Sequence, residues 1–96
     1  MNILTEQEIK NELLNVPNWV LINNYIQREF CISNFVEAVS FVLKVAFIAE
    51  KLDHHPDINI HSWNKVKITT STHEVNTLTK KDFELAKQIN SISFSN

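Results

Sequence analysis

The sequence predicts an α+β domain in which a four-stranded antiparallel sheet carries three helices on one face. Two observations support this class. Three segments combine helix-start signals with apolar residues at helical spacing, and four short segments alternate apolar and polar residues as strands do. Their order along the chain is helix, two strands, helix, two strands, helix. With 96 residues and a hydrophobic fraction of 44%, residues 1–96 fit a single domain with one core.

The first helix is expected over roughly residues 5–15, because Thr5–Glu8 has the form of a capping box and Pro17 follows. Trp19–Ile22 and Tyr25–Ile32 are rich in β-branched and aromatic residues, which favours two strands. The two asparagines between them suit a tight turn with positive φ. The chain is therefore expected to open with a helix and a β-hairpin.

The second helix is expected over Phe35–Leu52, with Asn34 as its N-cap. It is apolar around most of its circumference. A surface helix normally keeps a single apolar stripe about 100° wide. One face can pack on the sheet of the same chain, and the remaining apolar surface requires another cover. We expect a second copy of the chain to supply it. The alternative is a helix sunk deep between the sheet and the neighbouring helices.

The second half of the chain repeats the alternation of strands and helix. Pro56 ends the second helix, and strands are predicted over Ile58–Trp63 and Val66–Thr72 with the turn at Asn64-Lys65. The last helix is expected to start at Thr79–Asp82, which forms a second capping box.

Composition excludes several classes of function. The net charge of -2 provides no basic surface for phosphate groups, so nucleic acid is not expected as a partner, and the lysines at 65, 67, 80 and 81 are interpreted as solvated. A chain without glycine cannot form a glycine-rich phosphate loop, a dinucleotide-binding fingerprint or the nucleophile elbow of a serine hydrolase. The single cysteine, Cys31, predicts no intrachain disulfide. Neither a signal peptide nor a membrane-spanning segment is visible, which predicts a cytoplasmic protein.

The candidate site is centred on the adjacent histidines His54 and His55, between the second helix and the second pair of strands. Imidazole gives and takes protons near neutral pH. His73 and Asp82 lie at the end of the following hairpin and at the start of the last helix, and short connections could return them to the same rim. We therefore predict a small acid–base site built from three histidines, His54, His55 and His73.

Several neighbours and alternatives bear on this site. Glu50 and Asp53 precede the histidine pair and could fix the tautomer of a ring. Asp82 could cap the last helix and orient a histidine at once, whereas His61 is interpreted as exposed and structural. Zinc is the rival use of histidines, but no HExxH helix or paired cysteines are present and adjacent histidines seldom point both rings at one ion. No metal is therefore expected.

The spacing of these residues forms a motif. Glu50, His54-His55-Pro56, Trp63, His73 and Asp82 are separated by three, six, nine and eight residues. This set resembles the signature of the pterin-4a-carbinolamine dehydratase family, and the stretches at 49–51, 64–66 and 78–82 are similar to the same family. The signature spans about a third of the chain. After His73, where family members often carry glycines, this chain has Glu74–Thr77.

The resemblance implies dehydration of 4a-hydroxytetrahydropterin (pterin-4a-carbinolamine) to quinonoid dihydropterin, the step that recycles tetrahydrobiopterin after an aromatic amino acid hydroxylase. It implies a 4a-hydroxytetrahydrobiopterin dehydratase, a hydro-lyase with a small-molecule pterin substrate and no metal or other cofactor. It also implies a homodimer or homotetramer in which helices pack across the interface.

By the same resemblance, His54 and His55 are the acid–base pair and His73 holds the leaving hydroxyl. The orienting and substrate-binding residues are Asp82, Glu50, Asp53 and Trp63. Among these, Asp82 orients a histidine and Glu50 helps to bind the polar edge of the pterin ring. Two other functions stay open: a non-catalytic dimerisation or coactivator-type binding module, and a dehydratase-like protein of molybdopterin metabolism.

Overall fold

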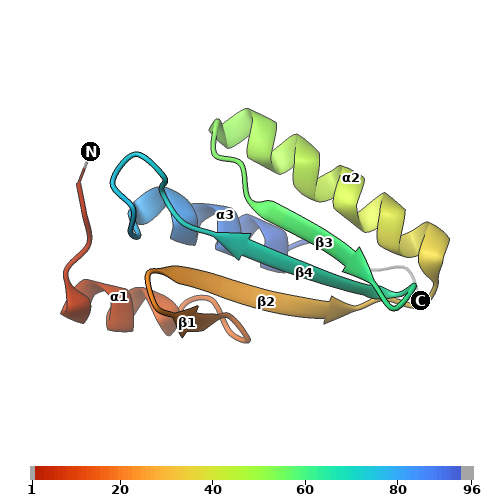
Figure 1. Ribbon diagram of the computed structural model, residues 1–96, viewed down its shortest axis with the longest axis horizontal. Coiled ribbons are helices and arrows are strands. Elements are labelled where there is room, and N and C mark those ends of the chain that lie inside the picture. The colour runs from red at the N-terminus through yellow and green to blue at the C-terminus, as the bar shows by residue number, and fades with distance from the viewer. Residues whose placement is uncertain (1, 94–96) are drawn as a thin grey trace.

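The computed structural model describes residues 2–93 and contains three helices and four strands within them (Figure 1). In chain order they are α1 (Glu6–Leu13), β1 (Val20–Ile22), β2 (Tyr25–Cys31), α2 (Phe35–Leu52), β3 (Asp57–His61), β4 (Lys65–Thr70) and α3 (Lys80–Asn90). The predicted α+β class and the predicted order of elements are confirmed.

The strands form one antiparallel sheet in the order β1-β2-β4-β3, so β2 and β4 are its inner strands. Alternate residues of these two strands point into the core, where Ile26, Phe30, Val66 and Ile68 are buried. Helices α2 and α3 run along one side of the sheet and pack on each other (Figure 1). Apolar residues of α1 pack against the same core.

The helix starts are those predicted from local sequence. In α1, the backbone amide of Thr5 donates to Glu8 Oε1 (2.9 Å) and the amide of Glu8 donates to Thr5 Oγ1 (3.1 Å). The side chain of Asn34 accepts from the amide of Glu37 at the start of α2, and Thr79 and Asp82 form the second capping box at the start of α3. Each helix therefore begins where a side chain accepts an otherwise unpaired backbone amide hydrogen.

The turn between β3 and β4 differs from the predicted one. β3 ends at His61, and the turn is made by Ser62 and Trp63, with φ of 50° and 57°, rather than by Asn64-Lys65. Asn64 is buried instead, and its Nδ2 donates to the carbonyl oxygen of Ile32 at 3.0 Å. The inward side chain of Asn64 therefore positions the turn, and Trp63 stands at its tip with 62% of its surface exposed. β4 likewise ends at Thr70 rather than at position 72.

Helix α2 has two apolar faces, of which only one packs on its own chain. Its buried residues are Ala38, Phe41, Val45 and Ala49. Five further apolar residues are 46–74% exposed: Phe35, Val36, Val39, Leu43 and Phe47. The alternative in which α2 is sunk between the sheet and its neighbours is therefore wrong. None of the helices within residues 2–93 has the length and apolarity needed to cross a membrane.

Candidate active site

The site lies where the end of α2, the start of β3, the end of β4 and the start of α3 meet. Helix α2 closes at Asp53, which adopts the left-handed conformation (φ 53°, ψ 45°) and turns the chain toward β3. The antiparallel pairing of Asp57 with Thr69 brings the segment after β4 beside the segment before β3. His54, His55 and His73 are therefore carried to one end of the sheet by the topology, as their order in the sequence predicts.

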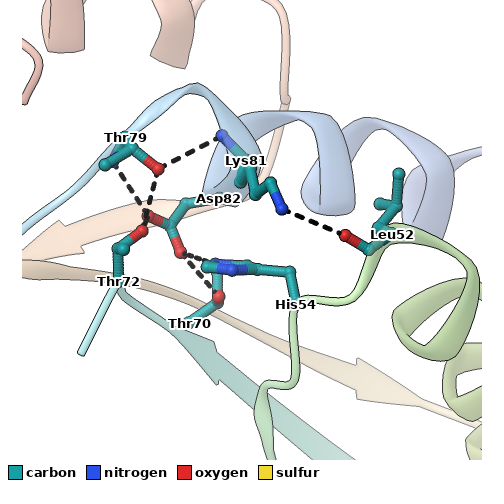
Figure 2. A network of polar contacts seen from close by, with 7 residues as sticks. All are labelled: Leu52, His54, Thr70, Thr72, Thr79, Lys81 and Asp82. Atoms are coloured by element: carbon teal, nitrogen blue, oxygen red, sulfur yellow. Dashed lines mark hydrogen bonds and ion pairs between the residues drawn. The ribbon is translucent and has the colours of Figure 1, made fainter. Parts of the chain in front are cut away.

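His54 is held by a fully buried carboxylate. Its Nε2 lies 2.6 Å from Oδ1 of Asp82, and the two side chains are 10% and 0% exposed. Figure 2 shows the ring of His54 turned toward Asp82 from the loop after α2. An ionised carboxylate has only acceptors, so a neutral His54 must carry its hydrogen on Nε2. Its Nδ1, which has no hydrogen bond to any of residues 2–93, then keeps a free lone pair.

His55 is also paired with a carboxylate, but at a more solvent-exposed position. Its Nε2 lies 2.6 Å from Oε1 of Glu50, one turn back on α2, and the side chains are 57% and 76% exposed. The two adjacent histidines therefore use different carboxylates from different helices. Water competes with the outer pair far more than with the inner one.

The three predicted histidines line one cavity with a volume of about 430 Å³, which is within the usual size of small-ligand pockets. Its lining residues are Asp53, His54, His55, Ser71, His73, Glu74 and Lys81. Such a pocket brings exchangeable protons from three imidazoles to one bound molecule. The arrangement can therefore supply general acid and general base groups to the same reaction.

Three residues of the predicted set are not among the described residues that line the pocket: Glu50, Trp63 and Asp82, the last of which is buried behind His54. Glu50 is not among the described residues that line the pocket, and its carboxylate contacts His55 instead. Trp63 stands at the exposed β3–β4 turn, at the other end of β3 from the histidine pair. Within one chain, Trp63 therefore does not form a wall of this pocket.

Other residues at the site were not predicted. The carboxylate of Asp82 also accepts hydrogen bonds from Thr70 Oγ1 and Thr72 Oγ1, each at 2.8 Å. Their signal in the sequence is the alternation that runs through β4 and the two residues after it, which places Thr70 and Thr72 at buried positions where a hydroxyl needs a partner. Lys81 lines the pocket while its Nζ lies 3.4 Å from the carbonyl oxygen of Leu52. Its contact with the end of α2 could not be read from local sequence.

Comparisons with known proteins agree on one family. Residues 2–92 match the family described as pterin 4 alpha carbinolamine dehydratase. Among similar proteins, one from Picosynechococcus sp. is 49% identical over 83 residues, which cover 86% of this chain and 89% of that protein. One from Chloroflexus aurantiacus is 47% identical over 89 residues, which cover 93% and 95%. Both are named provisionally as pterin-4-alpha-carbinolamine dehydratases.

Two solved structures share the fold. A crystal structure described as a transcriptional coactivator/pterin dehydratase from Brucella melitensis matches with a TM-score of 0.87 and 35% identity, and covers 94% of this chain and 97% of that one. A pterin dehydratase-like protein described as a RuBisCO assembly factor in the alpha-carboxysome matches with a TM-score of 0.65 and 16% identity, over 80% and 90%. The second likeness concerns the fold alone.

Proposed function

Because the chain belongs to the pterin 4 alpha carbinolamine dehydratase family, we propose that it dehydrates a 4a-hydroxytetrahydropterin to the quinonoid dihydropterin. The observation that carries this proposal is the shared pocket. His54, bonded through Nε2 to the buried Asp82, lines one cavity with His55 and His73.

The reaction moves two protons and breaks one C–O bond. The hydroxyl group leaves as water, so an acid must protonate it. A ring nitrogen of the pterin loses a proton as the C=N bond forms, so a base must accept it. Imidazoles serve in either direction near neutral pH, and one positioned acid or base typically contributes about 10²- to 10⁴-fold. Neither step requires a metal or a redox cofactor.

The hydrogen bonds of the site favour a division of roles. The free lone pair at Nδ1 of His54 suits the base, because Asp82 keeps the hydrogen on Nε2 and stabilises the ring once both nitrogens are protonated. His55, with Glu50 as its carboxylate partner, suits the acid. His73 then holds the leaving hydroxyl from the opposite segment of the pocket.

The partner proposed for the exposed face of α2 is a second copy of the chain. Phe35, Val39, Leu43 and Phe47 recur every four residues and are exposed, so they form one stripe along the helix. A contiguous apolar surface of this kind marks an interaction site. Because two identical stripes can face each other across a two-fold axis, a homodimer or an assembly of dimers buries them without a further protein.

The test is dehydration of chemically prepared 4a-hydroxytetrahydropterin by the purified protein. His54→Ala and His55→Ala are each expected to lower turnover at least about tenfold, since each removes a positioned acid or base. His61→Ala is the matched control, because His61 also pairs with a carboxylate, Glu29, at 2.5 Å but lies outside the pocket. Its turnover should equal that of the wild type.

Two results would contradict the proposal. Unchanged turnover in His54→Ala and His55→Ala would remove the acid–base mechanism. A wild-type protein that assembles through α2 but dehydrates no pterin would favour a non-catalytic binding module; the Brucella protein is described as a transcriptional coactivator as well as a pterin dehydratase.

A further inference from the structure

The carboxylate of Asp82 is saturated with donors. Oδ1 accepts from His54 Nε2 (2.6 Å) and Thr70 Oγ1 (2.8 Å), and Oδ2 accepts from Thr72 Oγ1 (2.8 Å) and the amide of Thr79 (3.0 Å). An ionised carboxylate offers about four lone-pair sites, so every one of them is used. A fully buried charge is tolerated when it is hydrogen-bonded in this way.

The directions of these bonds are fixed by counting hydrogens. The hydroxyl of Thr72 has one hydrogen, which it gives to Asp82, so at its 2.8 Å contact with Thr79 it must accept. Thr79 therefore donates to Thr72 and accepts from the amide of Lys81 (3.3 Å). Figure 2 shows this chain of contacts running from Lys81 through the threonines to Asp82. Each group in the chain donates to the next, and the last donor, the hydroxyl of Thr72, presents its hydrogen to the carboxylate.

The pair of Asp82 and His54 has two states to compare, which differ by one proton. In the first, an ionised Asp82 accepts from Nε2–H and Nδ1 has no hydrogen. In the second, the pair has taken one proton from solvent, so that a protonated Asp82 donates to Nε2 while His54 carries its own hydrogen on Nδ1. The second arrangement has no lone pair at Nδ1 for a substrate proton. Hydroxyl donors at Asp82 favour the first, because hydrogen bonds to the charged form stabilise it.

We propose that Thr70 and Thr72 are positioning residues of the active site: their hydroxyls keep Asp82 ionised and turned toward His54, and thereby keep the Nδ1 lone pair of His54 available to substrate. The kinetic part of this inference rests on the proposed dehydratase activity, whereas the tautomer of His54 does not.

Capping of α3 does not account for both threonines. The capping box consists of two reciprocal bonds: the side chain of Thr79 accepts from the backbone amide of Asp82, and Oδ2 of Asp82 accepts from the backbone amide of Thr79. Thr70 contacts Oδ1, the oxygen that also meets His54, and takes no part in the cap. Its hydroxyl is buried, comes from β4, and serves the face of the carboxylate that is turned toward the site.

The experiment combines kinetics with histidine ¹⁵N NMR on the full chain. Thr70→Val and Thr72→Val keep nearly the same shape but lose the donor. Each is expected to lower kcat about tenfold, the lower end of the effect typical for groups that orient a functional residue. KM should stay within about twofold, because neither threonine lines the pocket. In the double variant, the NMR signals of His54 should shift from the Nε2–H tautomer toward the Nδ1–H tautomer.

Serine variants are the matched controls. Thr70→Ser and Thr72→Ser lose a methyl group but keep the donor, so their kcat and their His54 signals should follow the wild type. If Thr72→Val disturbs folding through the cap, Thr70→Val still decides the question, since Thr70 bonds to Oδ1 of Asp82 and the capping bond is made by Oδ2.

Different results would contradict the role of the threonines and the proposed dehydratase activity. An unchanged Nε2–H signal in the folded double variant overturns the inference, whatever the activity. Equal losses of kcat in the serine and valine variants also overturn it, because packing would then be the cause. A wild type without dehydratase activity would contradict the proposed function, while a tautomer shift in the double variant would still support the inference.

Discussion

At the scale of single residues, burial separates three histidine–carboxylate pairs that look alike in sequence. His54 with Asp82 is buried, whereas His55 with Glu50 and the pair on the outer sheet face, His61 with Glu29, are open to water. An exposed ion pair is worth about 0.2–1 kcal/mol, while removing one partner of a buried pair costs about 3–5 kcal/mol. The contribution of each carboxylate to the site should follow this difference.

The contact between Glu50 and His55 predicts a kinetic effect different from that of a substrate-binding residue. Glu50→Ala should lower kcat by no more than about fivefold, the rate equivalent of an exposed pair worth about 1 kcal/mol. KM should be unchanged, because Glu50 is not among the described residues that line the pocket. Steady-state kinetics with varied pterin concentration provides the measurement.

Glu29→Ala is the control for this variant, since it removes the carboxylate partner of a histidine outside the pocket. It should leave both constants unchanged. A rise in KM at constant kcat in Glu50→Ala would instead assign Glu50 to the polar edge of the substrate, the role that the family resemblance implies.

At the scale of elements, capping side chains define where the helices begin, and one of these side chains, Glu8, is titratable. The amide of Thr5 donates to the carboxylate of Glu8, which lowers the pKa of Glu8 below its ordinary value of 4.5; the hydroxyl of Thr5 acts in the same direction. The carboxylate also lies in the first turn of α1, where negative charge is favoured by the helix dipole.

The lowered pKa of Glu8 predicts the sign of a pH effect on stability. In the folded protein the carboxylate form is favoured, so its contribution is fully present above the ordinary pKa of 4.5. The contribution is lost as pH falls through the lowered pKa. Urea unfolding of wild type and Glu8→Gln should therefore show a more stable wild type near neutral pH and convergence in acid.

Glutamine is the informative replacement because it can also occupy the third position of a capping box, so the hydrogen bond is kept and only the charge is removed. An NMR titration of Glu8 in the folded wild type should place its pKa below 4.5. A stability difference that does not change with pH would show that the charge of Glu8 has no role.

At the scale of the whole molecule, the exposed stripe of α2 is the feature that one chain leaves unexplained. Its large apolar residues lie on the helix face opposite the buried set of Ala38, Phe41, Val45 and Ala49. The site sits at the end of this same helix, since His54 follows its C-cap, Asp53. Assembly through α2 would therefore hold rigid the element that presents the histidine pair.

A charge placed in the stripe is expected to prevent assembly without unfolding the chain. Leu43→Glu should weaken self-association at least about 30-fold, the equivalent of about 2 kcal/mol for a central interface residue. The fold should persist, since Leu43 is already 57% exposed in the single chain. Sedimentation at micromolar concentration provides the measurement, and circular dichroism the check on folding.

Leu14→Glu is the matched control, because Leu14 is an exposed leucine, at 82%, that follows α1 rather than lying on α2. It should assemble like the wild type. A wild-type protein that sediments as a monomer, or a Leu43→Glu variant of unchanged mass, would contradict the proposed interface.

Much of the fold and part of the site could be predicted from sequence. The order of the elements, the two capping boxes and the amphipathic strands depend on periodicity and on contacts within about four residues, which a linear pattern contains. The proximity of His54, His55 and His73 could also be predicted, from the order of the elements. Short connections between antiparallel elements leave few places for the ends of those elements to go.

Beyond the capping contacts and the expectation that Asp82 orients a histidine, tertiary structure decided which distant groups touch. The bond between His54 and Asp82 joins residues 28 positions apart, and those of Asp82 to Thr70 and Thr72 span 12 and 10. Such contacts depend on how α3 packs against the sheet. For the same reason the prediction that Trp63 ends a strand is wrong. Its aromatic ring favours a strand, but the buried side chain of Asn64 places Trp63 in the turn. Local pattern determines what each segment becomes, whereas packing between segments determines which polar groups are buried together and must satisfy one another.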